Sequence, residues 1–199
     1  MDELIEEEKY IDTVFRKKVF SGLNLKNIRF SNSQFIAVDL SESKFPRLYI
    51  SDCTFDECNI SNTIMNDISV KDTNFTNSRM TGVQMNETNL EDVTFKDCKL
   101  DYAQFQYLKC KQSLSSNKRV KFERCILTNA YFQGSDLTGV IFENCDLSQT
   151  DFSECILKNA NFRGSKLSGM RVDINRLDGV TFDNNQIYYL IQLLGITIS

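Results

Sequence analysis

An apolar residue recurs at every fifth position over most of this 199-residue chain. The series runs without a miss from Phe15 to Cys110, and it runs again from Phe122 to Phe182. Within it, phenylalanine returns every twenty residues, at Phe15, Phe35, Phe55, Phe75 and Phe95, and then at Phe122, Phe142, Phe162 and Phe182. A period of five matches neither the period of about 3.6 of an α-helix nor the period of about 2 of a simple strand. Such repetition predicts one solenoid, in which each unit packs only on its neighbours.

A second, smaller residue recurs two positions before each large apolar one, as Val38, Cys53 and Ala103 illustrate. The residues between these positions are mostly Asn, Asp, Ser, Thr, Lys and Glu, which suit solvent and turns. Seven of the eight glycines fall two residues after the large position. A corner of the backbone would explain that placement, because glycine relieves strain where a chain bends. The pattern therefore predicts two inward side chains in every five and a turn after each pair.

The segments Ala130–Gly134, Cys145–Gln149, Thr150–Glu154 and Ala160–Gly164 resemble the pentapeptide-repeat family, whose pattern is often written A(D/N)Lxx. The resemblance covers about residues 10–184. It implies an all-β fold, a right-handed parallel β-helix of quadrilateral cross-section with four pentads per coil. Thirty-three pentads then make about eight coils, in which neighbouring strands lie ~4.8 Å apart.

The chain contains seven cysteines and no histidine. The cysteines lie at inward positions of the repeat, and no CxxC pair occurs, so we expect them to be structural. We expect no metal site and no cofactor. Because no glycine-rich phosphate loop or catalytic constellation is present, we expect a protein that is not an enzyme. The inward cysteines are Cys53, Cys58, Cys98, Cys110, Cys125, Cys145 and Cys155.

The predicted organisation is a single domain with one interruption. Residues 1–9 form an N-terminal cap or tail, and residues 10–112 and 120–184 form coils. Omitting residues 113–119 puts Phe122 back on the twenty-residue series, so this insertion should leave and rejoin the rod in phase. Basic residues cluster here, and contact with an acidic partner is one interpretation, while a neutral insertion is the other. The loop consists of Ser113, Leu114, Ser115, Ser116, Asn117, Lys118 and Arg119.

Residues 185–199 leave the repeat and predict a helix followed by a short strand. Asp183 or Asn184 is a candidate N-cap, and Gly195 is a candidate C-cap. Part of the apolar face of this helix should cover the last coil, and the surplus favours a two-fold homodimer. We expect the dimer interface to contain Ile187, Leu190, Ile191, Leu194, Ile196 and Ile198.

An acidic column is the remaining surface feature. Asp52, Asp72 and Asp92 recur every twenty residues and continue a series begun by Asp12 and Asn32. Like charges one coil apart repel by up to ~1 kcal/mol per pair in water, so the column does not stabilise the fold. It favours one of two interpretations: mimicry of DNA phosphates, or ordinary turn chemistry in which Asp and Asn are suitable residues.

The C-terminal stretch Leu177–Gln186, with the closing Leu194–Ile196, resembles the end of the Qnr and MfpA group of pentapeptide-repeat proteins. The matching residues are Gly179, Val180, Asp183 and Gln186. The resemblance implies a DNA-mimicking homodimer that binds DNA gyrase or topoisomerase IV and protects it from quinolones. Qnr proteins carry two loops and MfpA none, whereas this chain has one. The alternative is a binding scaffold for a different protein, such as an immunity factor or an effector module.

The net charge of −4 predicts no direct binding of nucleic acid. No apolar run is long enough to span a membrane. The first nine residues are acidic, where a signal peptide would be basic and then apolar, so we expect a cytoplasmic location.

Overall fold

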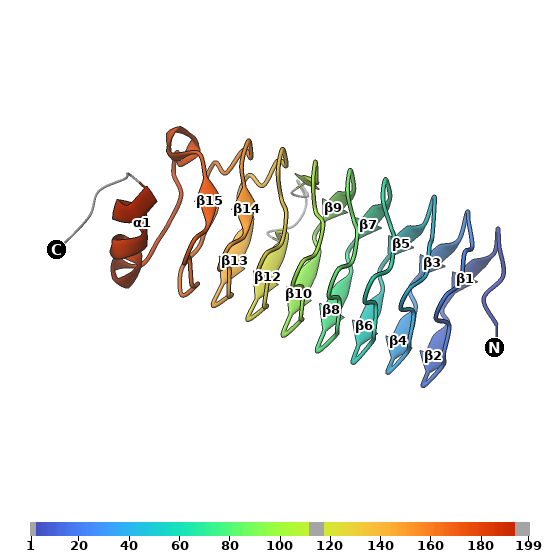
Figure 1. Ribbon diagram of the computed structural model, residues 1–199. Coiled ribbons are helices and arrows are strands. Elements are labelled where there is room, and N and C mark those ends of the chain that lie inside the picture. The colour runs from blue at the N-terminus through green and yellow to red at the C-terminus, as the bar shows by residue number, and fades with distance from the viewer. Residues whose placement is uncertain (1–2, 112–117, 194–199) are drawn as a thin grey trace.

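The computed structural model describes residues 3–111 and 118–193, and these residues coil into a parallel β-solenoid of about eight turns. Figure 1 shows the coils stacked along one axis, with the N-terminus at one end of the rod and a helix at the other. The solenoid that the five-residue period predicts is confirmed. No helix within the described ranges is long and apolar enough to cross a membrane.

Short parallel strands form the sides of the rod. One side has the order β1-β3-β5-β7-β9-β11, and the next has the order β2-β4-β6-β8-β10-β12-β13. The first sheet comprises β1 (Lys9–Ile11), β3 (Arg29–Ser31), β5 (Tyr49–Ser51), β7 (Ser69–Lys71), β9 (Asn89–Glu91) and β11 (Lys109–Lys111). The second comprises β2 (Val14–Arg16), β4 (Gln34–Ile36), β6 (Thr54–Asp56), β8 (Asn74–Thr76), β10 (Thr94–Lys96), β12 (Lys121–Glu123) and β13 (Ile141–Glu143). Near the C-terminus, β14 (Asp151–Phe152) pairs with β15 (Arg171–Val172).

The strand register follows the twenty-residue series and crosses the insertion without a shift. Phe55 pairs with Phe75, and Phe75 with Phe95. The partner of Phe95 on the other side is Phe122, so seven extra residues separate two neighbouring rungs of one sheet. The chain therefore leaves the rod and returns to it in phase.

Stacked phenylalanine rings form the centre of the rod. The ring of Phe75 lies 4.8 Å from that of Phe55 and 4.9 Å from that of Phe95, with nearly parallel planes. The same stacking joins Phe95 to Phe122 across the insertion, at 4.7 Å. Offset stacking of this kind adds about 0.5–1.5 kcal/mol per pair beyond the burial of apolar area.

The corners of the rod have left-handed backbone. At most corners, the residue two positions after a large apolar residue has a positive φ, between 45° and 73°. Gly164 shows why glycine is needed at some corners, because an added Cβ would lie 2.1 Å from the amide oxygen of Asn144 in the coil before. The corner side chain of one coil thus lies over the glycine of the next.

Where the small inward position holds Ser, Thr or Cys, its side chain can donate a hydrogen bond to the backbone. The Thr150 hydroxyl donates to Leu127 O at 2.8 Å, and the Cys145 thiol lies 3.4 Å from Phe122 O in the same arrangement. Burial raises the pKa of the Cys53 and Cys58 thiols to about 11, because the thiolate is disfavoured away from water. Six of the cysteines are buried and Cys110 is partly buried, so all seven pack within the wall or core of the rod.

The two ends of the rod are built differently. At the N-terminal end, Leu4 is buried against the first coil, and Ile5 N donates to the Tyr10 hydroxyl at 2.7 Å. Near the C-terminal end lie the 3-10 helices η1 (Ile174–Arg176) and η2 (Asn184–Gln186), and then α1 (Ile187–Leu193). A turn of 3-10 helix therefore precedes the α-helix, which begins at Ile187.

Gln186 joins the C-terminal helices to the last coils. Its side chain is buried, and its amide nitrogen donates to Phe162 O at 2.8 Å and to Ser165 O at 2.7 Å. Its amide oxygen accepts from Asp183 N at 2.6 Å, in a capping box with the N-cap residue Asp183. The predicted N-cap at Asp183 is confirmed for η2, and Gln186 satisfies carbonyls that a further coil would otherwise occupy.

Candidate functional site

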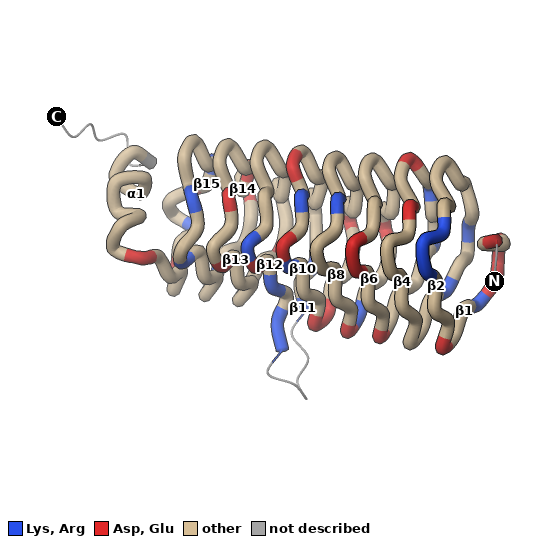
Figure 2. Tube along the Cα trace, turned by 90° about the horizontal axis from the view of Figure 1, so that it is seen from below, with Lys and Arg blue, Asp and Glu red and all other residues tan. Residues whose placement is uncertain are grey.

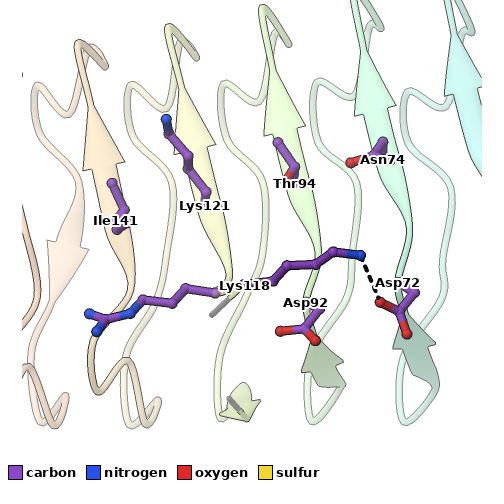
Figure 3. A pocket seen from close by; sticks show the side chains of 8 residues that line it. Asp72, Asn74, Asp92, Thr94, Lys118, Lys121 and Ile141 are labelled. Atoms are coloured by element: carbon purple, nitrogen blue, oxygen red, sulfur yellow. Dashed lines mark hydrogen bonds and ion pairs between the residues drawn. The ribbon is translucent and has the colours of Figure 1, made fainter. Parts of the chain in front are cut away.

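The end of the inserted loop is fastened to the acidic column. Residues 113–117 of the predicted loop lie outside the described residues, and Lys118 and Arg119 lie within them. Lys118 Nζ is 3.3 Å from Asp72 Oδ1, and its side chain passes Asp92 on the way (Figure 3). Arg119 lies beside Gly139, one coil beyond. The two basic side chains therefore extend over several neighbouring coils.

A groove of about 450 Å³ lies beneath these side chains. Its floor is the outer surface of the second sheet, and Figure 3 shows side chains of β8, β10, β12 and β13 pointing into it. Acidic and basic side chains lie next to one another along it, which suits a contact with polar or charged groups of a protein. The lining residues are Asp72, Asn74, Asp92, Thr94, Lys118, Arg119, Lys121 and Ile141.

Ion pairs within the rod hold the strand that follows the loop. Lys121 Nζ lies 2.6 Å from a carboxylate oxygen of Glu143 and 3.0 Å from one of Glu123. Arg124 binds both carboxylate oxygens of Asp97, at 2.8 and 2.9 Å. The hydrogen bond from Lys121 lowers the pKa of the Glu123 carboxyl, and that from Arg124 lowers the pKa of the Asp97 carboxyl. Much of the basic cluster that the sequence shows is thus paired with acids of the rod itself.

The acidic column follows one corner of the rod. Asp52, Asp72 and Asp92 have φ values of 55°, 45° and 54°, and Asp tolerates this left-handed region better than most residues. Asp52 is exposed, Asp72 is half-buried beneath Lys118, and Asp92 is buried, with 7% of its surface exposed. The part of the column that is open to a partner is therefore its N-terminal part.

Acidic residues occupy the other corners as well, a feature that the single column did not predict. Of the 25 non-glycine residues with positive φ in the described parts of the chain, 11 are Asp or Glu and 3 are Lys or Arg. Ten of these acids lie between Glu7 and Asp97, ahead of the loop. Figure 2 shows acidic positions along the lower edge of this part of the rod. Counting charges at the position two after each large residue would have found this surface from the sequence.

Glutamate at these corners is informative because it has no conformational advantage there. Asn and Asp are enriched in left-handed backbone, whereas Glu is not. Turn chemistry therefore explains the corner aspartates and leaves the choice of glutamate unexplained. The corner glutamates are Glu7, Glu42, Glu57, Glu87 and Glu154, and all are exposed.

The predicted dimer residues that the structure describes lie on α1. Ile187 has 60% of its surface exposed, and its neighbour Tyr188 has 50% exposed. Leu190 and Ile191 are half-buried, while Tyr189 packs against the core. Leu194, Ile196 and Ile198 lie outside the described residues.

No group of three or more His, Cys, Asp or Glu residues within 3–111 and 118–193 is arranged to hold a metal ion.

A family model for the pentapeptide repeat region matches residues 28–105 and 115–190. The chain belongs to the pentapeptide-repeat family. The gap between its two matched blocks, residues 106–114, reaches the start of the insertion, and the second block includes residues 115–119 of it. By sequence, no curated protein matches the chain.

Several solved structures resemble the rod. A trypsin-treated form of QnrB1, described as a plasmid-mediated fluoroquinolone resistance protein, has 21% identity and a TM-score of 0.48, over 96% of this chain and 100% of its own. HetL, a pentapeptide-repeat protein involved in heterocyst differentiation in the cyanobacterium Nostoc, has 14% identity and a TM-score of 0.40, over 88% of this chain and 89% of its own. The family assignment rests on the family model.

Proposed function

We propose that this protein binds a type II topoisomerase, DNA gyrase or topoisomerase IV, as a mimic of DNA, and protects it from quinolones. The observation that carries the proposal is the acidic corners between Glu7 and Asp97. Carboxylates repeated at fixed spacing along a rod present negative charge to a protein as the phosphates of a duplex do. The corner glutamates support this use, because the fold does not favour them there.

The spacing of the corners suits a surface that binds DNA. Successive coils lie ~4.8 Å apart, and the phosphates of one DNA strand are ~3.4 Å apart along the axis. Both distances are shorter than the Debye length of about 8 Å at physiological salt, so neighbouring charges act together. A partner with rows of Lys and Arg would then meet a continuous negative potential.

The loop gives the rod a feature that a plain DNA mimic lacks. Lys118 fixes the end of the loop beside Asp72 and Asp92. A basic segment next to an acidic edge fits a partner that has basic DNA-binding residues beside an acidic patch. We therefore assign the loop, Ser113–Arg119, to partner contact.

The sequence of the C-terminus supports the same assignment. The stretch Leu177–Gln186 resembles the end of the Qnr and MfpA group, and Asp183 and Gln186 within it close the rod. In the proposal, the exposed Ile187 and Tyr188 of α1 contribute to a homodimer joined at the C-terminal ends.

A supercoiling assay tests the proposal. Purified gyrase and topoisomerase IV are titrated with the protein, with and without ciprofloxacin. We expect the protein to restore part of the activity that the drug removes. A variant without residues 113–119 should keep the fold, because the loop leaves and rejoins the rod in phase, yet should lose protection. The proposal fails if the intact protein binds neither enzyme and changes drug sensitivity in neither reaction.

The covering of Asp72 and Asp92 by Lys118 favours a second candidate, a scaffold for a different protein partner. Such a partner would contact the loop and the groove rather than a row of free carboxylates. A pull-down in which one protein other than a topoisomerase depends on Lys118 and Arg119 for capture would favour this candidate.

A further inference from the structure

The N-terminal end of the rod is the open edge of two parallel sheets (Figure 1). β1 pairs with β3 and β2 with β4, and within the described residues neither has a second neighbour. In the second coil, the backbone N–H groups that face the N-terminal end donate to carbonyls of the first coil. Arg29 N donates to Glu8 O at 3.1 Å, and Gln34 N donates to Thr13 O at 2.8 Å. The equivalent groups of β1 and β2 point along the rod axis, away from the protein, where another strand can pair with them.

Four of the exposed side chains at this end of the rod are apolar. The exposed fraction is 58% for Ile5 and Ile11, 51% for Val14 and 74% for Val19. The residues paired with Ile11, Val14 and Val19 in the second coil are all polar, namely Ser31, Gln34 and Asp39. Exposed apolar side chains gathered at an open edge indicate a protein contact.

Two diagonally opposite corners of the first coil have opposite charge. Glu7, Asp12, Lys17 and Gly22 form its four corners in order, each with positive φ, so the Glu7 and Lys17 corners lie diagonally opposite. Each is flanked by residues of its own charge: Glu6 and Glu8 on one side of the rod, Arg16 and Lys18 on the other.

We propose that two copies of this chain pair at their N-terminal ends. The two-fold axis is perpendicular to the rod and passes through the Asp12 and Gly22 corners. A rotation about it places the Glu7 corner of each copy on the Lys17 corner of the other. It also places β1 of each copy against β2 of the other in the antiparallel sense, so that the open edges become one ladder of hydrogen bonds.

The side chains complement one another in this arrangement. Around the Asp12 corner, apolar residues meet apolar residues, and around the Glu7 and Lys17 corners, opposite charges meet. Two like-charge contacts oppose this arrangement: Lys9 lies opposite Arg16, and Asp12 of each copy meets Asp12 of the other at the two-fold axis. The matched residues are Ile11 with Val14, Ile5 beside Val19, Glu8 with Lys17, and Glu7 with Lys18.

The helical rise of the coil favours the same axis. The first coil is a ramp, on which earlier residues project further toward the open end than later ones. This rotation reverses the direction of the chain around the coil, so a step of one residue toward the C-terminus in one copy lies opposite a step of one residue toward the N-terminus in the other. A projecting part of one ramp therefore meets a recessed part of its mate, and the spacing between the two ends is the same all the way round.

This pairing is independent of the proposed topoisomerase binding and uses the end of the rod opposite α1. If the C-terminal helices pair as well, the two contacts alternate and the rods join end to end into filaments. Variants that disrupt one end at a time then show, by their oligomeric state, which of the two contacts forms.

Light scattering after size-exclusion chromatography tests the proposal. The variant Ile187→Lys disables the C-terminal contact and should leave a dimer of the 23.0-kDa chain through the N-terminal ends. Adding Ile11→Ser and Val14→Gln, the residues that the second coil has at these positions, should give a monomer with an unchanged melting temperature. An Ile187→Lys protein that is monomeric at every concentration, or a dimer that survives both N-terminal changes, overturns the proposal.

A charge exchange tests the two-fold axis itself, again in the Ile187→Lys protein. Lys17→Glu with Lys18→Glu places acid on acid, and Glu7→Lys with Glu8→Lys places base on base. Each variant alone should weaken dimerisation at least tenfold. Because each variant supplies the charge that the other lacks, an equimolar mixture should form heterodimers. A mixture that stays as monomeric as its components rules out the proposed axis.

Discussion

Each phenylalanine of the central stack contacts the rings of the coil before and the coil after. Phe75 is almost completely buried between Phe55 and Phe95. Phe75→Ala should therefore lower the free energy of unfolding by about 3–5 kcal/mol, since it removes a large buried side chain and leaves a cavity. Urea denaturation measures the loss, with the exposed Asn74→Ala as a control that should change little. A loss below about 1 kcal/mol for Phe75→Ala would show that neighbouring coils close over the gap.

The buried thiols make stability depend on alkaline pH. Burial raises the pKa of Cys58 to about 11 from its usual value of 9.0, so the folded protein binds this proton more tightly than the unfolded chain. The resulting stability is fully present below about pH 9 and is lost as the pH rises toward 11, by about 2–3 kcal/mol. Cys58→Ser keeps a donor for Phe35 O and removes the titration. Denaturation at about pH 8 and pH 10.5 should show a smaller drop for this variant than for the parent. Equal drops would mean that Cys58 does not contribute.

At the scale of an element, Gln186 should control the stability of the C-terminal coils. Gln186→Ala leaves the carbonyls of Phe162 and Ser165 without their donor, at a cost of about 1–3 kcal/mol each. Hydrogen exchange should then become faster in residues 160–182 and remain unchanged in the first coils, because coils interact mainly with their neighbours. Gln192→Ala, at an exposed position of α1, is the matched control. Equal exchange in the two variants would refute a capping role for Gln186.

The elements also show what the sequence can and cannot predict. The coils and their register across residues 113–119 follow from periodicity, since every pentad repeats the same local requirement. The N-cap at Asp183 follows from the helix-start signal where the repeat ends. The contact of Lys118 with Asp72 does not follow, because it joins residues 46 apart through a loop that obeys no period. The acidic corners could have been predicted from the sequence, because all four rows of corners repeat every twenty residues. The acidic column Asp52, Asp72 and Asp92 is only one of these four rows.

At the scale of the whole molecule, the charge is arranged unevenly along the rod. Acidic corners occupy the coils ahead of the loop, while the corners beyond it are mostly Asn and Gly, with Glu154 the one acid among those described. A net charge of −4 does not reveal this arrangement, because most lysine and arginine residues lie away from the corners, on the flat faces and at the loop. The proposed DNA mimicry therefore belongs to one part of the rod rather than to its whole length.

Displacement of DNA from gyrase tests this central claim most directly. Labelled duplex bound to purified gyrase is titrated with the protein at several salt concentrations. We expect displacement that weakens as salt rises, since the contact is electrostatic. A four-edge variant neutralises one acid in each of the four rows of corners. Because each face of the rod is bounded by two of these rows, the variant removes two charges from any face. Its changes are Glu42→Gln, Asp52→Asn, Glu57→Gln and Glu87→Gln.

At about 0.2–1 kcal/mol for each exposed pair, this variant should displace DNA roughly 2- to 30-fold less well, with an unchanged melting temperature. Glu154→Gln, at the same kind of corner beyond the loop, should behave like the parent protein. Failure of the intact protein to displace DNA, or equal displacement by the parent and the four-edge variant, would contradict the account.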